Sequence, residues 1–175
     1  MLIRDKIAVV TGAASGIGNA VVQRLVAAGA KQVGMVDLTD TVHSAADQVN
    51  EAEGTQVARA FQGDVTDSEF RTQVFQVLGE NTPVQLCVPA AGILRDAMAV
   101  KLNKATDEAE LYDQDLFRQV LEVNLIHPVY WTMQMIAGIA EHRAKTGAGK
   151  WSADEELQGC SVIVGSVSSL SLIHI

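Results

Sequence analysis

Residues 6–18 constrain the fold of this chain more than any other stretch, because three local patterns follow one another there without a gap. The apolar run KIAVVT, residues 6–11, predicts a strand that is buried on both faces. Residues 19–28 carry apolar side chains at helical spacing and are followed by Gly29, so they predict a helix. Between the two lies a glycine-rich turn, where the backbone can approach a pyrophosphate and the helix N-terminus favours negative charge. The sequence therefore predicts a dinucleotide site after the first strand, although a glycine turn alone would also serve a purely conformational purpose.

The same alternation of strand and helix continues along the chain. Further strands are predicted over residues 32–38, 56–61, 84–88 and 159–164, and further helices over residues 40–53, 67–78 and about 115–141. Such alternation is typical of a parallel sheet, so we expect an α/β fold with a Rossmann-type doubly wound parallel sheet in three layers, α/β/α. Two stretches, 101–115 and 144–158, are long for connections and are expected to be surface insertions.

Composition limits the classes of function. A chain of 175 residues has room for one domain with a hydrophobic core, and 48% hydrophobic with 19% charged residues is typical of a soluble globular protein. The formal charge of −8 and the lack of a basic stripe argue against a nucleic-acid partner. No apolar run reaches the roughly 18 residues of a membrane span, and the first residues lack a signal-peptide core. We therefore expect a cytoplasmic protein with no membrane partner.

The sequence offers no pattern of metal ligands. Its four histidines and two cysteines are not spaced as ligand sets. Cys87 and Cys160 lie far apart in apolar segments and are expected to be buried free thiols. We therefore expect no metal site.

Asp37 ends the second predicted strand, 19 residues after Gly18. An acidic side chain at about 20 residues from the glycine turn accepts hydrogen bonds from the adenosine ribose hydroxyls. Taken alone, such an aspartate would more often cap a helix. Together with the glycine turn it predicts a preference for NAD over NADP, because a carboxylate repels a 2′-phosphate and the turn contains no Arg or Lys to offset that repulsion.

The glycine turn reads TGAASGIG over residues 11–18 and resembles the TGxxxGxG motif of the short-chain dehydrogenase/reductase family. Gly63-Asp64-Val65 is similar to the family's Asp-Val pair, whose carboxylate meets the adenine amino group. Ala90-Ala91-Gly92 resembles the end of its Asn-Asn-Ala-Gly motif, but Pro89 and Ala90 replace the asparagines, which puts their sheet-stabilising contacts in doubt. The resemblance implies a cofactor site formed by Thr11, Gly12, Ser15, Gly16, Ile17, Gly18, Asp37, Leu38, Asp64, Val65, Ala90, Ala91 and Gly92.

The resemblance also implies catalytic residues. Asn124 matches the family's active-site asparagine, which holds a helix irregularity and a water of the proton relay, and Ser166 matches the serine that binds the substrate oxygen, with Ser168 as its competitor. The family's acid–base tyrosine comes about 13 residues after that serine, with a lysine four later, so neither falls within 175 residues. Tyr112 and Tyr130 are no substitutes, because neither is followed by a lysine four residues on; they are expected in a loop and in helix packing. We therefore expect the chain as printed to be inactive.

The function implied is an NAD(P)-dependent oxidoreductase that transfers a hydride between the nicotinamide cofactor and an alcohol or ketone. Residues 92–98, GILRDAM, resemble the GITRD stretch of the 3-oxoacyl-(acyl-carrier-protein) reductase branch, which favours a 3-hydroxyacyl or 3-oxoacyl substrate. A non-catalytic dinucleotide-binding module and a methyltransferase are the alternatives. Residues 1–169 are expected to be the N-terminal part of one NAD(P)-binding domain, incomplete at its C-terminus, and residues 170–175 a non-native tail. The full-length form is expected to be a homodimer or homotetramer.

Overall fold

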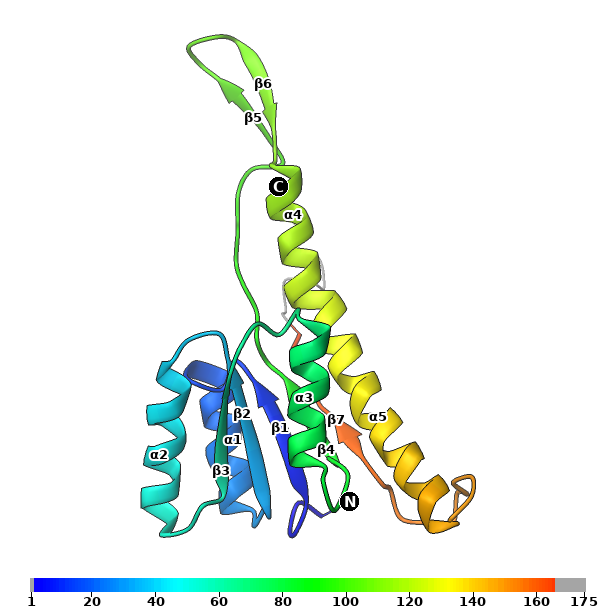
Figure 1. Cartoon of the computed structure of the whole chain (residues 1–175). Helices are drawn as coiled ribbons and strands as arrows, with labels where there is room; N and C mark the ends of the chain where they lie inside the picture. The colour runs from blue at the N-terminus through cyan, green and yellow to red at the C-terminus, as the bar shows by residue number, and fades with distance from the viewer. Residues whose placement is uncertain (1, 166–175) are drawn as a thin grey trace.

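Five parallel strands form the central sheet of the protein, whose computed structural model describes residues 2–165. They are β1 (Ile7–Thr11), β2 (Gln32–Asp37), β3 (Ala58–Gln62), β4 (Leu86–Pro89) and β7 (Cys160–Ser161), in the spatial order β3-β2-β1-β4-β7 (Figure 1). The chain runs outward from β1 to β3 and then returns to the other side of β1 for β4. This reversal is the switch point of a doubly wound sheet, so the expected Rossmann-type α/β fold is confirmed.

Helices cover both faces of the sheet. One face carries α1 (Gly16–Ala27) and α2 (Thr41–Glu53), and the other carries α3 (Ser68–Leu78) and α5 (His127–Thr146). Successive side chains of a strand point to opposite faces, so Ala8 and Val10 of β1 pack with α1 and α2. Ile7 and Val9 pack with α3 and α5 on the opposite face. Because all of β1 is buried, its sequence is an unbroken apolar run.

A long helical stretch consists of α4 (Gln114–Leu121), a π-helical turn η1 (Glu122–Ile126) and α5, which follow one another without a break (Figure 1). It begins at Asp113, whose carboxylate accepts hydrogen bonds of 2.8 and 2.9 Å from two backbone N–H groups of the first turn. It ends at Gly147, which adopts a left-handed φ of 72°. The helix predicted over residues 115–141 is confirmed, and the π turn is an irregularity within it.

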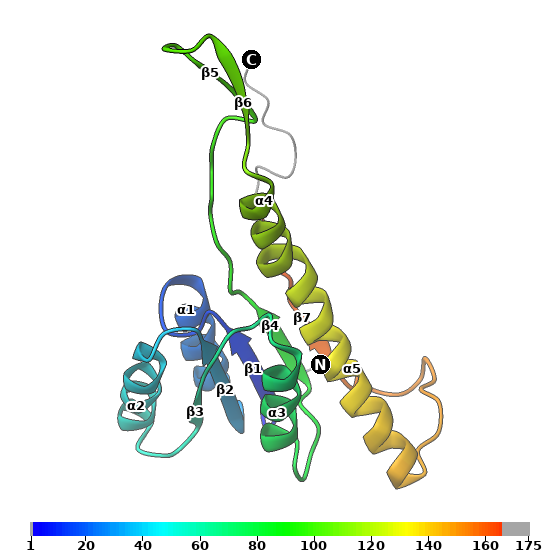
Figure 2. The same ribbon diagram turned by 45° about the horizontal axis from the view of Figure 1, so that its top comes forward.

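The first insertion is an antiparallel hairpin rather than an irregular loop. Its strands are β5 (Val100–Asn103) and β6 (Glu108–Leu111), and it projects away from the sheet (Figures 1 and 2). All of β6 is exposed, as is β5 apart from the half-buried Asn103. Because both sides of the hairpin face solvent, the sequence shows none of the apolar alternation that marks a half-buried strand. The expected surface position is confirmed, and the hairpin itself was not predicted.

Strand β7 is shorter than the strand expected over residues 159–164, and Pro89 explains why. The backbone N–H of Cys160 donates to the carbonyl of Gln85, and that of Val162 donates to the carbonyl of Cys87. In a parallel ladder the next bond would come from the N–H of residue 89 to the carbonyl of Val162, but proline has no N–H. Pairing therefore stops after Ser161. Cys87, on the inner strand β4, is buried as expected, but Cys160, on the edge strand of the described sheet, is exposed rather than buried.

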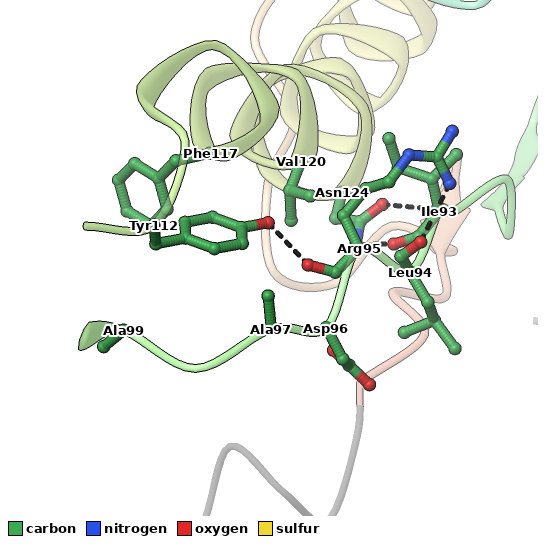
Figure 3. A pocket seen from close by; sticks show the side chains of 10 residues that line it. All are labelled: Ile93, Leu94, Arg95, Asp96, Ala97, Ala99, Tyr112, Phe117, Val120 and Asn124. Carbon is green, nitrogen blue, oxygen red and sulfur yellow. Dashed lines mark hydrogen bonds between the residues drawn. The ribbon is translucent and has the colours of Figure 1, made fainter. Parts of the chain in front are cut away.

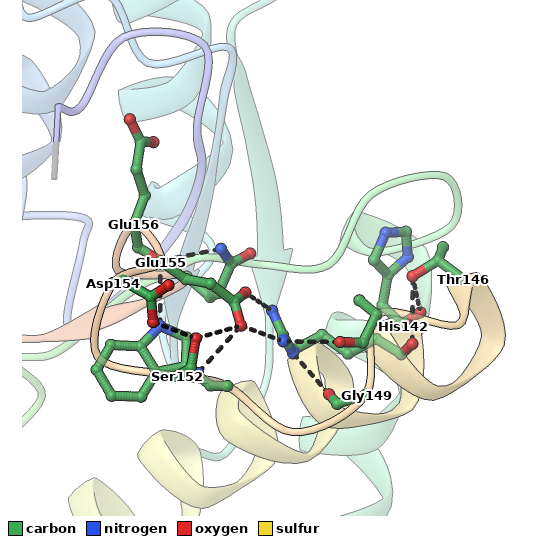
Figure 4. Close-up of polar contacts among 11 residues, drawn as sticks. His142, Thr146, Gly149, Ser152, Asp154, Glu155 and Glu156 are labelled. Atoms are coloured by element: carbon green, nitrogen blue, oxygen red, sulfur yellow. Dashed lines mark hydrogen bonds and ion pairs between the residues drawn. The ribbon is translucent and has the colours of Figure 1, made fainter.

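The second insertion folds back against the end of α5. Arg143, which is almost buried, forms an ion pair of 2.7 Å with Glu155 and donates to the carbonyls of Ala148 and Gly149. Glu155 also accepts a hydrogen bond from the backbone N–H of Ser152 (Figure 4). The hydrogen bonds from Arg143 lower the pKa of the Glu155 carboxyl. The insertion is thus held at its base by one arginine.

Two general findings concern residues 2–165. No helix in this part of the chain is long and apolar enough to cross a membrane. Within the same residues, no group of three or more His, Cys, Asp or Glu side chains is placed to hold a metal ion.

Candidate functional site

A cleft of about 520 Å³ opens at the carboxyl ends of β1, β2 and β4, where the strand order reverses. Crevices at this position of an open α/β sheet are the usual ligand sites of such folds. Every residue expected to bind the cofactor lines the cleft except Thr11, namely Gly12, Ser15, Gly16, Ile17, Gly18, Asp37, Leu38, Asp64, Val65, Ala90, Ala91 and Gly92. The structure therefore brings together residues from four separate stretches of the sequence.

The glycine turn lies tightly against the end of β4. Gly12 has a φ of +65°, and a Cβ on it would lie 2.8 Å from the Cα of Ala91. A Cβ on Gly18 would collide with the carbonyl oxygen of Gly12, so the start of α1 packs equally closely on the turn. Both positions require glycine. Neither glycine places a side chain in the cleft, and the first turn of α1 carries no acidic residue.

Thr11 lies beneath the cleft rather than in its wall. Its side chain is fully buried, and its hydroxyl oxygen accepts a hydrogen bond of 3.0 Å from the backbone N–H of Ala91. This bond ties the end of β1 to the segment after β4. The structure thus places Thr11 where it positions Ala91 and Gly92, which line the cleft.

The carboxylate of Asp37 is held at the end of β2 by three hydrogen bonds. One oxygen accepts from the backbone N–H of Ala14 in the glycine turn at 3.1 Å. The other accepts from the backbone N–H and the hydroxyl of Thr39, at 3.1 and 3.0 Å. A carboxylate has about four acceptor sites, so capacity remains for a further donor. Asp37 is half-buried and lines the cleft, which makes it a fixed negative charge beside the glycine turn.

The turn after β3 is anchored from below. Asp64 accepts hydrogen bonds from the backbone N–H and hydroxyl of Thr66, at 2.9 and 2.8 Å. The carbonyl of Val65 accepts a bond of 2.9 Å from the indole N–H of the fully buried Trp131 on α5. This hydrogen bond from α5 therefore holds Val65, and with it the Asp64–Val65 wall of the cleft, in position.

His127 is buried at the start of α5, close to this wall. Neither ring nitrogen has a hydrogen-bond partner among the described residues. Burial lowers the pKa of His127 to about 4, with the nearby Asp64 opposing the shift and Arg71 adding to it. At neutral pH the imidazole is uncharged, so it contributes packing rather than charge to the site.

Asn124 lies in the π turn η1 and grips the backbone of Ile93 (Figure 3). Its amide oxygen accepts from the N–H of Ile93 and its amide nitrogen donates to the carbonyl of Ile93, both at 2.8 Å. Asn124 was expected to lie at a helix irregularity, and it lies in a π-helical turn. Ser166 and its competitor Ser168 lie outside the described residues.

Four further residues line the cleft that were not predicted from the sequence: Ile93, Arg95, Gln119 and Val123. Arg95 is the one cationic residue that lines the cleft in the described part of the chain. Gln119 and Val123 are four residues apart on the helical stretch that contains Asn124, so helical spacing was the available signal. Ile93 directly follows Gly92 and could have been included with it.

Tyr112 lies in a connection between elements, as expected, whereas Tyr130 lies on a helix but is exposed rather than packed. Tyr112 lies in the connection between β6 and α4 and donates its hydroxyl to the carbonyl of Arg95 at 2.6 Å. Tyr130 lies on α5, where the guanidinium of Arg71 stacks 5.3 Å from its ring centroid. Neither tyrosine lines the cleft.

The known proteins that this chain resembles in sequence include two named as dehydrogenases and one named as a reductase. Galactitol 2-dehydrogenase (L-tagatose-forming) of Cereibacter sphaeroides is 33% identical over 124 residues, which cover 71% of this chain and 43% of the relative. NAD-dependent glycerol dehydrogenase of Listeria innocua is 31% identical, covering 85% of this chain and 51% of the relative. A 3-oxoacyl-(acyl-carrier-protein) reductase of Salmonella typhimurium is also 31% identical, covering 71% and 46%.

Solved structures give the same picture. A Beutenbergia cavernae protein, provisionally described as an NAD(P) dependent gluconate 5-dehydrogenase with NADP bound at low occupancy, superposes with a TM-score of 0.61 and 30% identity. The match covers 79% of this chain and 51% of that structure. The chain thus spans about half the length of the proteins it resembles. Residues 6–148 match the family described as short chain dehydrogenase, so the chain belongs to the short-chain dehydrogenase family.

Proposed function

We propose that the whole protein is an NAD-preferring oxidoreductase that transfers a hydride between the nicotinamide cofactor and an alcohol or ketone. The observation that carries the proposal is the carboxylate of Asp37, fixed at the end of β2 and facing the cleft beside the glycine turn. When bound, the cofactor supplies the hydride or accepts it. The methyltransferase alternative is set aside by the family assignment.

The residues of the cleft fit a dinucleotide. Gly12, Gly16 and Gly18 line the cleft without side chains, which favours close approach of a pyrophosphate, and the N-terminus of α1 has no acidic residue that would oppose its charge. Asp37 has acceptor capacity left for ribose hydroxyls. Asp64 lies at the far wall, where we assign it to the adenine amino group. Asn124 is proposed to act through Ile93, which it holds against the cleft.

The preference for NAD follows from charge. A 2′-phosphate placed beside the Asp37 carboxylate would bring two anionic groups together in a partly desolvated cleft, which raises the cost of binding NADP. Arg95 is the one cationic residue that lines the cleft among the described residues, but it follows β4, whereas Asp37 lies at the end of β2. The Beutenbergia cavernae structure, which resembles this chain, is described with NADP bound at low occupancy, so the charge of Asp37 and not the fold alone carries the proposed preference.

Isothermal titration of the purified chain with NAD, NADP and S-adenosylmethionine tests the proposal. We expect NAD to bind at least about tenfold more tightly than NADP, which corresponds to about 1.4 kcal/mol, and S-adenosylmethionine not to bind. Asp37→Ala should abolish the discrimination. Asp40→Ala is the matched control, because Asp40 is an exposed acidic residue nearby whose side chain makes no capping bond among the described residues. Equal or tighter binding of NADP by the unaltered chain would contradict the proposed preference.

A second candidate is a dinucleotide-binding module without turnover. Neither Tyr112 nor Tyr130 is followed by a lysine four residues on, so neither matches the acid–base pair of the family. We propose that the chain as printed binds NAD but transfers no hydride. Assays with NAD and a panel of secondary alcohols test this, and measurable NADH formation would contradict it. The 3-oxoacyl substrate class, the cytoplasmic location, the homodimeric or homotetrameric state and the domain limits stay predictions.

A further inference from the structure

A second cavity, of about 300 Å³, adjoins the cofactor cleft (Figure 3). One wall is the segment 93–99 after β4, and the other is formed by Tyr112, Phe117 and Val120 around the start of α4. The two cavities share Ile93 and Arg95, so a ligand could extend from one into the other. We call this second cavity the hairpin pocket, because the β5–β6 hairpin connects its two walls.

Hydrogen bonds join the two walls of the hairpin pocket. At the base of the hairpin, the backbone N–H of Tyr112 donates to the carbonyl of Ala99 at 3.0 Å. The hydroxyl of Tyr112 reaches across to the carbonyl of Arg95 at 2.6 Å, as Figure 3 shows. The rings of Tyr112 and Phe117 meet edge to face, with centroids 6.4 Å apart. These contacts hold two aromatic rings in defined positions beside the cleft.

Two polar side chains of the hairpin pocket, Tyr112 and Asn124, are engaged in hydrogen bonds, whereas Arg95 and the exposed Asp96 keep free capacity. The Tyr112 hydroxyl donates to Arg95, and the Asn124 amide is paired with the backbone of Ile93. The Arg95 guanidinium donates to the carbonyl of Leu94. Near the rings of Tyr112 and Phe117 a hydroxylated chain would find side-chain partners only in Arg95 and Asp96, whereas an apolar group would gain contact with both rings.

We propose that the hairpin pocket takes the apolar or aromatic substituent of a ketone or secondary alcohol whose reacting carbon lies in the adjoining cleft. The proposal rests on the proposed dehydrogenase function and narrows its substrate class. A cavity of about 150 Å³ is enough to hold benzene, so a pocket of about 300 Å³ has room for a substituent of one or two rings. This preference sets the chain apart from its relatives named for galactitol and glycerol.

Protein NMR of the isotope-labelled chain with NAD tests the proposal, using acetophenone as the apolar probe and glycerol as the polyol probe. Acetophenone should shift the resonances of residues 93–99, Tyr112 and Phe117, and glycerol should not. In Phe117→Ala the affinity for acetophenone should fall at least about fivefold, because the pocket loses one ring. Leu116→Ala is the matched control, since Leu116 is the exposed apolar neighbour on α4 and does not line the pocket.

The outcomes separate the two proposals. NAD binding without acetophenone shifts at the pocket, or with an unchanged acetophenone affinity in Phe117→Ala, overturns the pocket assignment and leaves the cofactor proposal standing. Glycerol shifts as large as those of acetophenone at the same residues also overturn the assignment. Acetophenone shifts confined to the pocket in a chain that fails to bind NAD support the pocket and overturn the cofactor proposal.

Discussion

Asn124 and Ile93 hold each other through two reciprocal hydrogen bonds of 2.8 Å between the side-chain amide of one and the backbone of the other. The two residues are 31 positions apart in the chain, and the contact joins the π turn to the segment that follows β4. A Cβ on Gly92 would lie 3.4 Å from the amide oxygen of Asn124, so the backbone at Gly92 also lies close to the Asn124 side chain. The pair fixes the boundary between the cofactor cleft and the hairpin pocket, since Ile93 lines both.

Replacing Asn124 with alanine should loosen this boundary. Asn124→Ala leaves the N–H and the carbonyl of Ile93 without their partner, and we expect a loss of about 1–2 kcal/mol in the free energy of unfolding. NAD affinity should fall as well, because Ile93 is no longer held at the cleft. Urea unfolding and NAD titration measure the two effects. Asn124→Asp, which keeps an acceptor for the Ile93 N–H, should lose less stability than the alanine variant; an equal loss would contradict the two-bond explanation.

Substitution of Gly12 should lower the free energy of unfolding. In Gly12→Ala the new methyl group meets the backbone of Ala91 at 2.8 Å in a left-handed conformation, so we expect a destabilisation of about 2–4 kcal/mol. Gly16→Ala is the comparison, because Gly16 also has a positive φ of 54° but has no described atom within 4 Å of its Cβ position. It should cost only about 1 kcal/mol. Urea unfolding of the two variants checks this, and an equal cost would show that the contact with Ala91 is unimportant.

The buried His127 predicts a pH dependence of stability. Its pKa is lowered to about 4 in the folded protein, whereas an unfolded histidine titrates near 6.5. Between these values the unfolded state binds a proton that the folded state does not, so stability is full above about pH 6.5 and falls as the pH drops toward 4. The loss from this group reaches at most about 3 kcal/mol. Urea unfolding across this range measures it, and His127→Phe should flatten the profile; an unchanged slope in that variant would refute the assignment.

Pro89 limits the pairing of β7, and a residue with an N–H should extend it. In Pro89→Val the new N–H can donate to the carbonyl of Val162, and we expect that amide to exchange with solvent at least about tenfold more slowly than an exposed one. The new bond contributes about 1 kcal/mol, and the loss of proline's restraint on the unfolded chain offsets about as much, so overall stability should change little.

Hydrogen exchange monitored by NMR reports on the amide of residue 89 directly. Pro83→Val serves as the control, because Pro83 precedes β4 and lies outside its paired residues. Rapid exchange at residue 89 would mean that something other than the missing N–H ends β7.

Local pattern in the sequence determined the alternation of strands and helices, the glycine turn and the position of Asp37, whereas Asp64 was identified by its resemblance to the family's Asp-Val pair. These features depend on burial of a strand on both faces, on helical spacing and on short turns, and each is encoded within about 20 residues. Strand β1 is the clearest case, because its apolar run and the turn after it predicted both the buried strand and one wall of the cleft.

Only the tertiary structure decided which distant residues meet. Three contacts join segments that no local period relates. Asn124 is hydrogen-bonded to Ile93, and Tyr112 to Arg95. Arg95 and Gln119 also line the same cleft. The hairpin was not predicted because both its faces are exposed, and the early end of β7 depends on a proline in the neighbouring strand. Local periodicity reports which side of an element is buried, whereas these contacts depend on what lies across the gap, which becomes defined only when the elements pack.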